Sequence, residues 1–277
     1  MERLINIYNE DCFLTMKDRV SDGSVNIVLT SPPYNTGRAF SDERALENYE
    51  GRYDIYLDNM TQDEYIEWTL RLFNEFDRVL SKDGVVLYNM SYGSDTSINT
   101  ESVGLMWLVV ADIIRNTAFT VADRIIWKKA SALPNNVSKN KLTRIVEDVF
   151  VFARKDEIKT FNANKQIKSV RSDNGQKTYI NVLNFIEAVN NDGPCPYNKA
   201  TYSSELCEKL LNIYAVSDTV VYDPFMGTGT TAVACKRLGL DCIGSELSAT
   251  QVAYANERLG ETRQKEIDSG QMSLFGG

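Results

Sequence analysis

The sequence Val220-Val221-Tyr222-Asp223-Pro224-Phe225-Met226-Gly227-Thr228-Gly229-Thr230-Thr231 decides the fold of this chain. Its apolar start is typical of a buried strand. Its glycines permit a tight turn and a close approach of the backbone to a ligand. The threonines that follow begin a predicted helix, whose N-terminus favours anionic groups. Strand, glycine-rich turn and helix therefore follow one another here.

The segments on either side continue this alternation. We expect helices at 203–214, 230–238 and 248–259, and strands at 219–222 and 241–244. Alternating strands and helices predict an α/β fold with a mostly parallel, doubly wound sheet and helices on both faces. Glu246, twenty-three residues after Asp223, ends the second of these strands. A carboxylate there is placed to hydrogen-bond the two ribose hydroxyls of a nucleoside.

A second motif, Thr30-Ser31-Pro32-Pro33-Tyr34-Asn35, follows an apolar run at 25–29 that predicts a buried strand. The two prolines end the strand, because neither can donate a hydrogen bond to a neighbouring strand. The stiff turn would hold two acceptors, Ser31 Oγ and the Pro32 carbonyl, beside the ring of Tyr34. This arrangement suits a planar substrate with an amino group at its edge. The alternative is a strand that simply ends in a proline turn.

The remaining elements complete the predicted sheet. The sequence predicts strands at 4–10, 85–88, 125–127 and 149–152, helices at 13–19 and 103–115, and a long polar loop at 38–61. Thr61 and Glu64 have the spacing of a capping box at the start of another helix. Tyr65, Trp68, Leu72 and Phe76 follow at helical spacing, and we expect them in the core rather than in contact with a ligand.

Composition excludes several classes of chemistry. The chain of 277 residues contains no histidine, so a histidine general base, a histidine-containing triad and histidine-ligated metals are excluded. Its five scattered cysteines have no C-x-x-C spacing, which predicts neither a disulfide framework nor a zinc site and fits a reducing cytoplasm. No apolar run is long enough to span a membrane, and the N-terminus lacks the pattern of a signal peptide. We therefore expect a cytoplasmic protein without a metal.

The charge of the chain is unevenly distributed. Residues 124–177 hold 13 Lys and Arg against 5 Asp and Glu, although the whole chain has a net charge of −8. This basic region is a candidate surface for nucleic-acid phosphates, and a merely solvated face is the alternative. We expect a single domain over 1–260 with an inserted recognition region at about 128–197, followed by a polar tail over 261–277. The candidate phosphate contacts are Lys128, Lys129, Lys139, Lys141 and Arg144.

Together, S-P-P-Y near the N-terminus and D-P-F-x-G-x-G-T-T near the C-terminus resemble the β-class of DNA amino-methyltransferases, which use S-adenosylmethionine. The resemblance extends from Asp11 to about residue 259 and implies a Rossmann-like methyltransferase fold. It implies cofactor contacts from Asp11, Cys12, Asp223, Pro224, Phe225, Gly227, Gly229, Thr230, Thr231 and Glu246. It places the target base against Ser31, Pro32, Pro33 and Tyr34. The family's H-P-A segment corresponds to Asn198-Lys199-Ala200-Thr201-Tyr202, which lacks the histidine and proline, so we assign no contact there.

The activity that this resemblance implies is site-specific methylation of double-stranded DNA at the amino group of a flipped base. Ser31 and Pro32 would accept the amino hydrogens and Tyr34 would stack on the base, with neither a covalent intermediate nor a metal. The first hypothesis is N4 of cytosine, with which S-P-P-Y is associated in this family, and the alternative is N6 of adenine. An RNA or small-amine substrate and a non-catalytic nucleoside-binding module remain as further alternatives. Methylation at carbon 5 of cytosine would need a cysteine nucleophile, for which Cys195 is the candidate. The order of the two motifs argues against this chemistry.

Three partners besides DNA follow as hypotheses. Similar enzymes act beside a restriction endonuclease, and many form homodimers. The segment Gln271-Met272-Ser273-Leu274-Phe275 is similar to the short peptide by which bacterial proteins bind the replication sliding clamp. The alternative for this tail is that it folds back onto the body.

Overall fold

The computed structural model describes residues 3–35, 60–91, 104–132, 142–161, 163, 167–179, 183–195, 198 and 201–268. Lys139, Lys141, the clamp-like tail at 271–275 and most of the predicted loop at 38–61 lie outside these residues.

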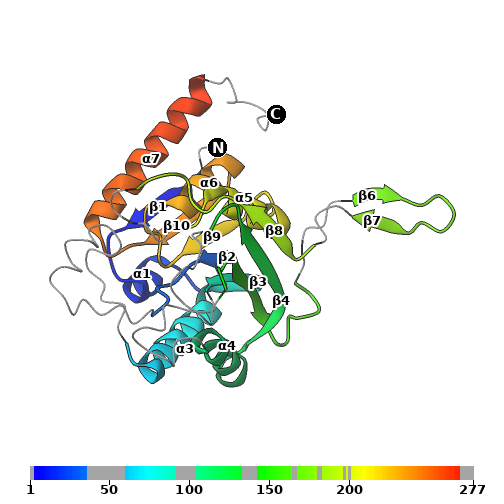
Figure 1. The fold of residues 1–277 in the computed structure, drawn as a ribbon, viewed down its shortest axis with the longest axis horizontal. Helices are drawn as coiled ribbons and strands as arrows, with labels where there is room; N and C mark the ends of the chain where they lie inside the picture. The colour runs from blue at the N-terminus through cyan, green and yellow to red at the C-terminus, as the bar shows by residue number, and fades with distance from the viewer. Residues whose placement is uncertain are drawn as a thin grey trace.

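The described residues are organised around an eight-stranded sheet with the order β1-β10-β9-β2-β3-β5-β4-β8 (Figure 1). Its strands are β1 (Ile5–Tyr8), β2 (Val25–Thr30), β3 (Leu80–Met90), β4 (Phe119–Lys129), β5 (Val146–Arg154), β8 (Phe185–Ala188), β9 (Val220–Asp223) and β10 (Asp241–Ser245). β5 is antiparallel to both of its neighbours, whereas the other adjacent strands pair in parallel. The predicted mostly parallel sheet is thus confirmed.

Helices cover both faces of this sheet. They are α1 (Cys12–Arg19), α3 (Gln62–Val79), α4 (Leu105–Asn116), α5 (Ser204–Tyr214), α6 (Thr230–Leu238) and α7 (Ala249–Asp268). α1, α3 and α4 pack on one face, where they meet Val28 and Val86, and α5 and α6 pack on the other, where they meet Ile27 and Val85. Successive side chains of a strand point to opposite faces, so these apolar runs are buried on both sides. The doubly wound arrangement is confirmed.

The capping box predicted for the third helix is present. Thr61 caps α3, its hydroxyl accepting a hydrogen bond from the Glu64 amide while the Glu64 carboxylate accepts one from the Thr61 amide at 2.8 Å. Tyr65, Leu72 and Phe76 are fully buried, as the helical spacing predicted. The cap therefore fixes where the apolar face of α3 begins.

Two elements are longer than the sequence suggested. β3 begins at Leu80 rather than after Gly84, because Leu80 already pairs with Val25. α7 runs through Gly260 to Asp268, so the first part of the expected polar tail is helical. The residues after Gly260 are mostly good helix formers and include no proline, which allows the helix to continue.

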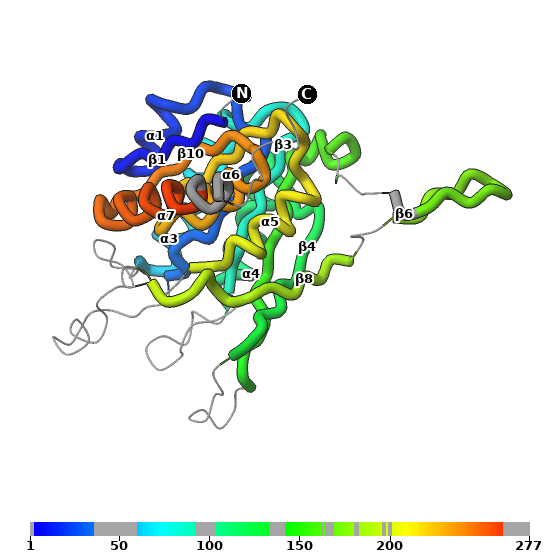
Figure 2. The backbone as a smooth tube through the Cα atoms, turned by 90° about the horizontal axis from the view of Figure 1, so that it is seen from above, coloured from blue at the N-terminus to red at the C-terminus, as the bar shows by residue number. Residues whose placement is uncertain are grey.

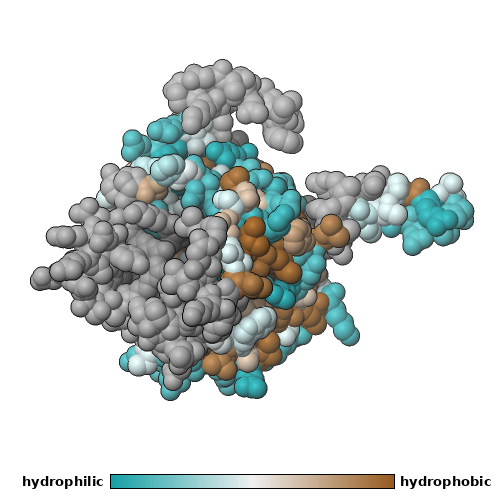
Figure 3. All heavy atoms as spheres, in the orientation of Figure 1, coloured by the Kyte–Doolittle hydropathy of each residue, from teal (hydrophilic) through white to brown (hydrophobic). Residues whose placement is uncertain are grey.

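The inserted region at about 128–197 contains regular structure beyond the strand predicted at 149–152. β6 (Ile167–Val170) and β7 (Lys177–Tyr179) form an antiparallel hairpin that projects from the body (Figures 1 and 2). Its tip is largely hydrophilic (Figure 3). β8 joins the main sheet beside β4, so part of the inserted region at about 128–197 is a strand of this sheet, which no predicted element indicated. β8 has only four residues, too few for its alternation of exposed and buried side chains to stand out in the sequence.

Candidate active site

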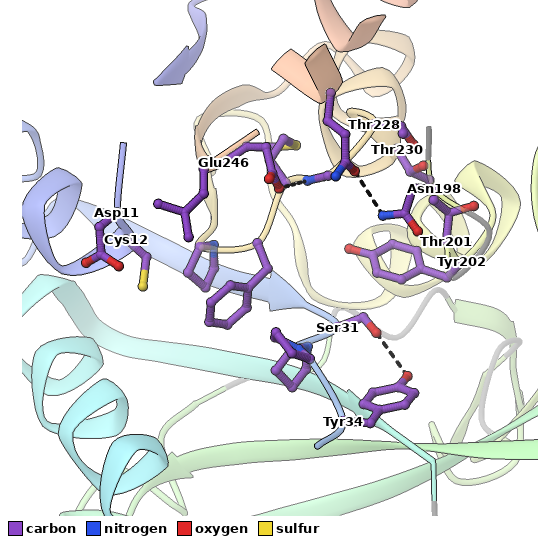
Figure 4. A pocket seen from close by; sticks show the side chains of 18 of the residues that line it. Asp11, Cys12, Ser31, Tyr34, Asn198, Thr201, Tyr202, Thr228, Thr230 and Glu246 are labelled. Atoms are coloured by element: carbon purple, nitrogen blue, oxygen red, sulfur yellow. Dashed lines mark hydrogen bonds between the residues drawn. The ribbon is translucent and has the colours of Figure 1, made fainter. Parts of the chain in front are cut away.

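The two sequence motifs line one cavity at the carboxyl ends of the parallel strands (Figure 4). Ser31 follows β2, Pro224 follows β9 and Glu246 follows β10, although these strands are far apart in the sequence. β2 and β9 are neighbours whose next helices, α3 and α6, lie on opposite faces, which is where ligands bind in open α/β sheets. The cavity encloses about 1100 Å³ including the space at its mouth.

The buried carboxylate of Asp223 holds the glycine-rich loop in place. It accepts hydrogen bonds from Thr30 Oγ1 at 2.7 Å, Thr231 Oγ1 at 2.6 Å, the Phe225 amide at 3.0 Å and the Tyr202 hydroxyl at 3.1 Å. Burial raises the pKa of Asp223, and these hydrogen bonds oppose that rise. Four donors use the acceptor capacity of one carboxylate. Asp223 therefore shapes the loop, and it does not line the cavity.

The two glycines of the loop have different surroundings. Gly227 lines the cavity with φ +54°, and the nearest atoms to an added Cβ would be polar side-chain atoms at 3.6 Å. Gly229 has φ +82°, and an added Cβ would lie 2.7 Å from the Cβ of Ala255 on α7. Gly229 is therefore required for helix packing, whereas the sequence suggested ligand approach for both glycines. Thr231 likewise lies behind the wall, and Thr230 lines the cavity.

Glu246 joins the glycine-rich loop to the start of α7. Its Oε2 accepts from the Gly227 amide at 2.8 Å and its Oε1 from the Ser248 amide at 2.9 Å. These bonds fix a half-buried carboxylate at the cavity wall (Figure 4). A carboxylate is an acceptor without a donor, which is the chemistry that a ligand's hydroxyls require.

Asp11 and Cys12 form another part of the wall. Asp11 caps α1 by accepting from the Phe13 amide at 2.9 Å, which places it after β1 beside Glu246 and Leu247 in the cavity lining. Burial, followed by the charge of Asp11, raises the pKa of the Cys12 thiol. Cys12 is therefore a neutral thiol that contributes shape rather than a nucleophile.

The proline turn forms the opposite end of the cavity. Ser31, Pro32, Pro33 and Tyr34 all line it, and Ser31 Oγ lies 2.9 Å from the Tyr34 hydroxyl (Figure 4). The Pro33 carbonyl accepts a hydrogen bond from the buried Tyr65 hydroxyl at 2.6 Å. α3 thus anchors the turn.

Trp68 packs against the core, as its helical spacing predicts, but it also reaches the cavity, where no ligand contact was expected. It lines the cavity, and its ring centroid lies 5.5 Å from that of Phe225 in the glycine-rich loop. Helical spacing groups Trp68 with the buried aromatic residues of α3, but the position of its ring depends on a loop more than 150 residues away. Together Trp68 and Phe225 give the cavity an aromatic wall between its two ends.

The segment before α5 also contributes to the cavity, although no contact was assigned there. Asn198 donates from Nδ2 to Gln251 Oε1 at 2.9 Å, and both residues line the cavity with Thr201 and Tyr202. The available signal was the position of Asn198 in the stretch that corresponds to the family's H-P-A segment. Gln251 gave no comparable signal, because it lies within a helix whose polar residues look alike in the sequence.

Three of the candidate phosphate contacts lie in the described residues: Lys128 and Lys129 end β4, and Arg144 precedes β5. Lys128 forms an ion pair with Glu187, and Lys129 forms one with Glu147 at 2.5 Å. Arg144 is exposed just before β5. The structure therefore gives both lysines carboxylate partners, which reduces the positive charge that they offer to phosphates.

Within the described ranges, neither Cys195 nor a metal-binding cluster of side chains belongs to the cavity. Cys195 is half-buried and is not among the residues that line the cavity. Within those ranges, no group of three His, Cys, Asp or Glu side chains is arranged to hold a metal ion. None of the helices there is both long enough and apolar enough to cross a bilayer.

Comparisons with known proteins agree with this geometry. The profile of the N6/N4 methyltransferase family, described as DNA methylase, matches residues 25–257. The Type II methyltransferase M.MthZI of Methanothermobacter thermautotrophicus is 27% identical over 88% of this chain and 74% of its own length. The structure of the cytosine-N4-specific PvuII DNA methyltransferase superposes with a TM-score of 0.67 at 19% identity, covering 92% of this chain and 86% of that one. The structure of a complex of M1.HpyAVI with S-adenosylmethionine superposes with a TM-score of 0.56 at 22% identity, covering 92% of this chain and 100% of that one.

Proposed function

This chain belongs to the N6/N4 family of DNA methylases, and we propose that it methylates N4 of cytosine in double-stranded DNA. Its activity is the transfer of a methyl group from S-adenosylmethionine to the exocyclic amino group of a DNA base. The observation that carries the proposal is the single cavity that contains both the Ser31–Tyr34 turn and the Gly227–Glu246 wall.

The wall around Glu246 fits a nucleoside cofactor. The carboxylate is fixed by two backbone amides and can accept from ribose hydroxyls, and Gly227 leaves space beside it. Asp11 and Cys12 lie at the same end of the cavity, where they would contact the adenine, and Pro224, Phe225 and Thr230 complete the wall. Asp223, Gly229 and Thr231 act indirectly by holding the loop. When bound, S-adenosylmethionine supplies the electrophilic methyl group.

The proline turn fits a base turned out of the duplex. Flipping brings the amino group within reach of Ser31 Oγ and the Pro32 carbonyl, which accept its hydrogens and direct the nitrogen lone pair toward the methyl group. Tyr34 packs against the base, and Pro33, held by Tyr65, stiffens the turn. Transfer would leave S-adenosylhomocysteine as the product, and the methylated amino nitrogen would release one proton to solvent. Alignment of the two reactants is the main source of the rate.

Cytosine rather than adenine is proposed because Ser31 opens the S-P-P-Y motif. The experiment is nucleoside mass spectrometry on unmethylated duplex DNA after incubation with the protein and S-adenosylmethionine. N4-methylcytosine is the expected product. N6-methyladenine would contradict the choice of base while leaving the site and the chemistry intact, and 5-methylcytosine would contradict both.

The region at about 128–197 is the proposed recognition segment of the single domain at 1–260. It contains the basic excess and the projecting β6–β7 hairpin, which supports a role on DNA. Lys128, Lys129, Lys139, Lys141 and Arg144 remain proposed phosphate contacts. Replacing them together should weaken DNA binding and reduce its dependence on salt concentration.

The further partners are also proposals. A cognate endonuclease, a homodimer and clamp binding through 271–275 would each place this activity in a larger assembly. The free cysteines support a reducing cytoplasm as the compartment. Deleting residues 271–277 tests the clamp directly: the intact chain should bind it and the shortened chain should not.

A further inference from the structure

The hydroxyl of Tyr34 connects the base end of the cavity to two strands behind it. Among the described residues it lies within hydrogen-bond distance of Ser31 Oγ at 2.9 Å, Asn89 Oδ1 at 2.8 Å and Glu147 Oε2 at 3.2 Å. Asn89 comes from β3 and Glu147 from β5, and neither lines the cavity. Within the described part of the chain, the contact that links these two residues to the cavity is the Tyr34 hydroxyl.

The atoms behind Tyr34 are hydrogen-bond acceptors. Asn89 donates from Nδ2 to the Asp148 carbonyl at 3.2 Å, so its oxygen is the atom that faces Tyr34. Glu147 is almost buried, and its other carboxylate oxygen accepts from Lys129 Nζ at 2.5 Å. Neither an amide oxygen nor a carboxylate oxygen can donate. The single hydroxyl hydrogen of Tyr34 is therefore directed toward Asn89 and Glu147.

This arrangement fixes the direction of the hydrogen bond between Ser31 and Tyr34. Because the tyrosine hydrogen is already engaged, the hydroxyl of Ser31 must donate to the tyrosine oxygen. Ser31 Oγ then presents only lone pairs to the cavity. A base amino group, which donates, satisfies them, whereas an oxo group at the same position would bring two acceptors together.

We propose that Asn89 and Glu147 are positioning residues that act through the Tyr34 hydroxyl to keep Ser31 an acceptor, so that the site takes an amino base and rejects an oxo base. The inference rests on the proposed function and adds the residues that set its selectivity. A site built to hydrogen-bond a substrate donor discriminates strongly against an analogue that lacks it, because buried polar groups are left unpaired. Without the tyrosine hydroxyl, the Ser31 hydroxyl can rotate and donate to an oxo group.

The first test is a double-mutant cycle with Ser31→Ala and Tyr34→Phe. Tritiated S-adenosylmethionine and unmethylated genomic duplex DNA are used, and the single-turnover rate and the dissociation constant of the cofactor are measured. We expect a loss of about 100-fold for Ser31→Ala and about tenfold for Tyr34→Phe, with unchanged cofactor binding. The double variant should lose about 100-fold rather than about 1000-fold, since the tyrosine hydroxyl acts through Ser31. Independent losses that multiply would overturn the proposal.

The same logic tests Glu147 with a matched control. Glu147→Gln should slow the wild type about threefold and have no effect in the Tyr34→Phe background. Glu208→Gln removes an ion pair with Arg237, outside the network, and Tyr214→Phe removes a hydroxyl outside the cavity; both should leave the rate unchanged. A Glu147→Gln defect that persists without the tyrosine hydroxyl would show a purely structural role and contradict the proposal.

Selectivity gives a second readout. After the methylated position is mapped, duplexes carrying either the natural amino base or its oxo analogue at that position are compared in binding. We expect the wild type to prefer the amino base and Tyr34→Phe to reduce this preference about tenfold. An unchanged preference would overturn the proposal. A wild type that binds S-adenosylmethionine but labels no DNA would instead overturn the proposed function, and this inference with it.

Discussion

The cofactor end and the base end of the cavity are assembled in different ways. At the cofactor end, Glu246 holds the Gly227 amide 19 residues before it and Gly229 packs against Ala255, although Asp223 also accepts from Thr30 on β2. At the base end, Ser31 and Tyr34 depend on Asn89, 55 residues away from Tyr34, and on Glu147, 113 residues away from it. The loop of the cofactor end is therefore recognisable as a local sequence motif, whereas the residues that support the base end meet only when β3 and β5 pair in the sheet.

The largest expected effect follows from removing the support beneath the cofactor loop. Asp223→Ala would leave the hydroxyls of Thr30 and Thr231 and the Phe225 amide without their buried acceptor. We expect the free energy of unfolding to fall by about 3 kcal/mol or more, measured by urea denaturation. Asp218→Ala, at an exposed carboxylate, is the control and should change it by less than about 0.5 kcal/mol. Equal stability of the two variants would contradict a supporting role for Asp223.

The raised pKa of Asp223 predicts that the stability of the protein depends on pH. Burial raises the pKa of this carboxyl group in the folded protein. A carboxyl group whose pKa is raised by folding contributes stability that is full below the unfolded pKa and is lost as the pH rises through the folded pKa. The stability of the wild type relative to Asp223→Asn should therefore decrease as the pH rises above the usual pKa of an aspartate. A difference that is constant with pH would show that the hydrogen bonds fully offset burial.

The two glycines separate packing from ligand contact within the same loop. Gly229→Ala adds a Cβ that meets Ala255 at a positive φ, and we expect a loss of about 2–4 kcal/mol in the free energy of unfolding. Gly227→Ala has no such clash and should lose only about 1–2 kcal/mol, but it should weaken cofactor binding because its Cβ enters the cavity wall. Thermal denaturation and calorimetric titration with S-adenosylmethionine measure the two effects. Equal losses of stability would refute the distinction.

Glu246→Gln tests the cofactor end without disturbing the base end. Glutamine keeps only one acceptor oxygen, so its NH2 would face either the Gly227 or the Ser248 amide, which also donates, and ribose hydroxyls would meet a weaker acceptor. We expect the dissociation constant of S-adenosylmethionine to rise about 10- to 100-fold, and the single-turnover rate at saturating cofactor to change little. A loss of rate at saturation with unchanged affinity would reverse the roles assigned to the two ends.

The smallest effect is expected at Cys195. It lies outside the cavity lining, so Cys195→Ser should transfer methyl groups within about twofold of the wild-type rate. The measurement is incorporation of tritium from labelled S-adenosylmethionine into duplex DNA. Loss of activity together with retained cofactor binding would favour a cysteine nucleophile instead.

The same contrast between the two ends explains what could be predicted from the sequence. The strand, glycine turn and helix around Asp223, the capping box at Thr61 and the proline turn at Ser31 are local patterns, and each lies where it was expected. Trp68 packs against the core as expected, but its place in the cavity wall was missed, because helical spacing separates the faces of a helix and does not reveal what each face meets.

Other features depend on pairings that no local pattern contains. Asn89 and Glu147 carry no motif, and their meeting at Tyr34 requires β3 and β5 to be adjacent and antiparallel. The pairing of β8 with β4 at the edge of the sheet likewise depends on a contact that no local sequence pattern reveals. The sequence also suggested that Asp223 touches the cofactor, whereas its hydrogen bonds are used within the protein.

The most direct test of the two-ended cavity is the single-turnover rate of Ser31→Ala at saturating S-adenosylmethionine. If Ser31 accepts from the amino group and takes no part in holding the cofactor, the rate should fall about 100-fold while the dissociation constant of the cofactor stays unchanged. Full activity of Ser31→Ala, or a defect restored by more cofactor, would contradict the account.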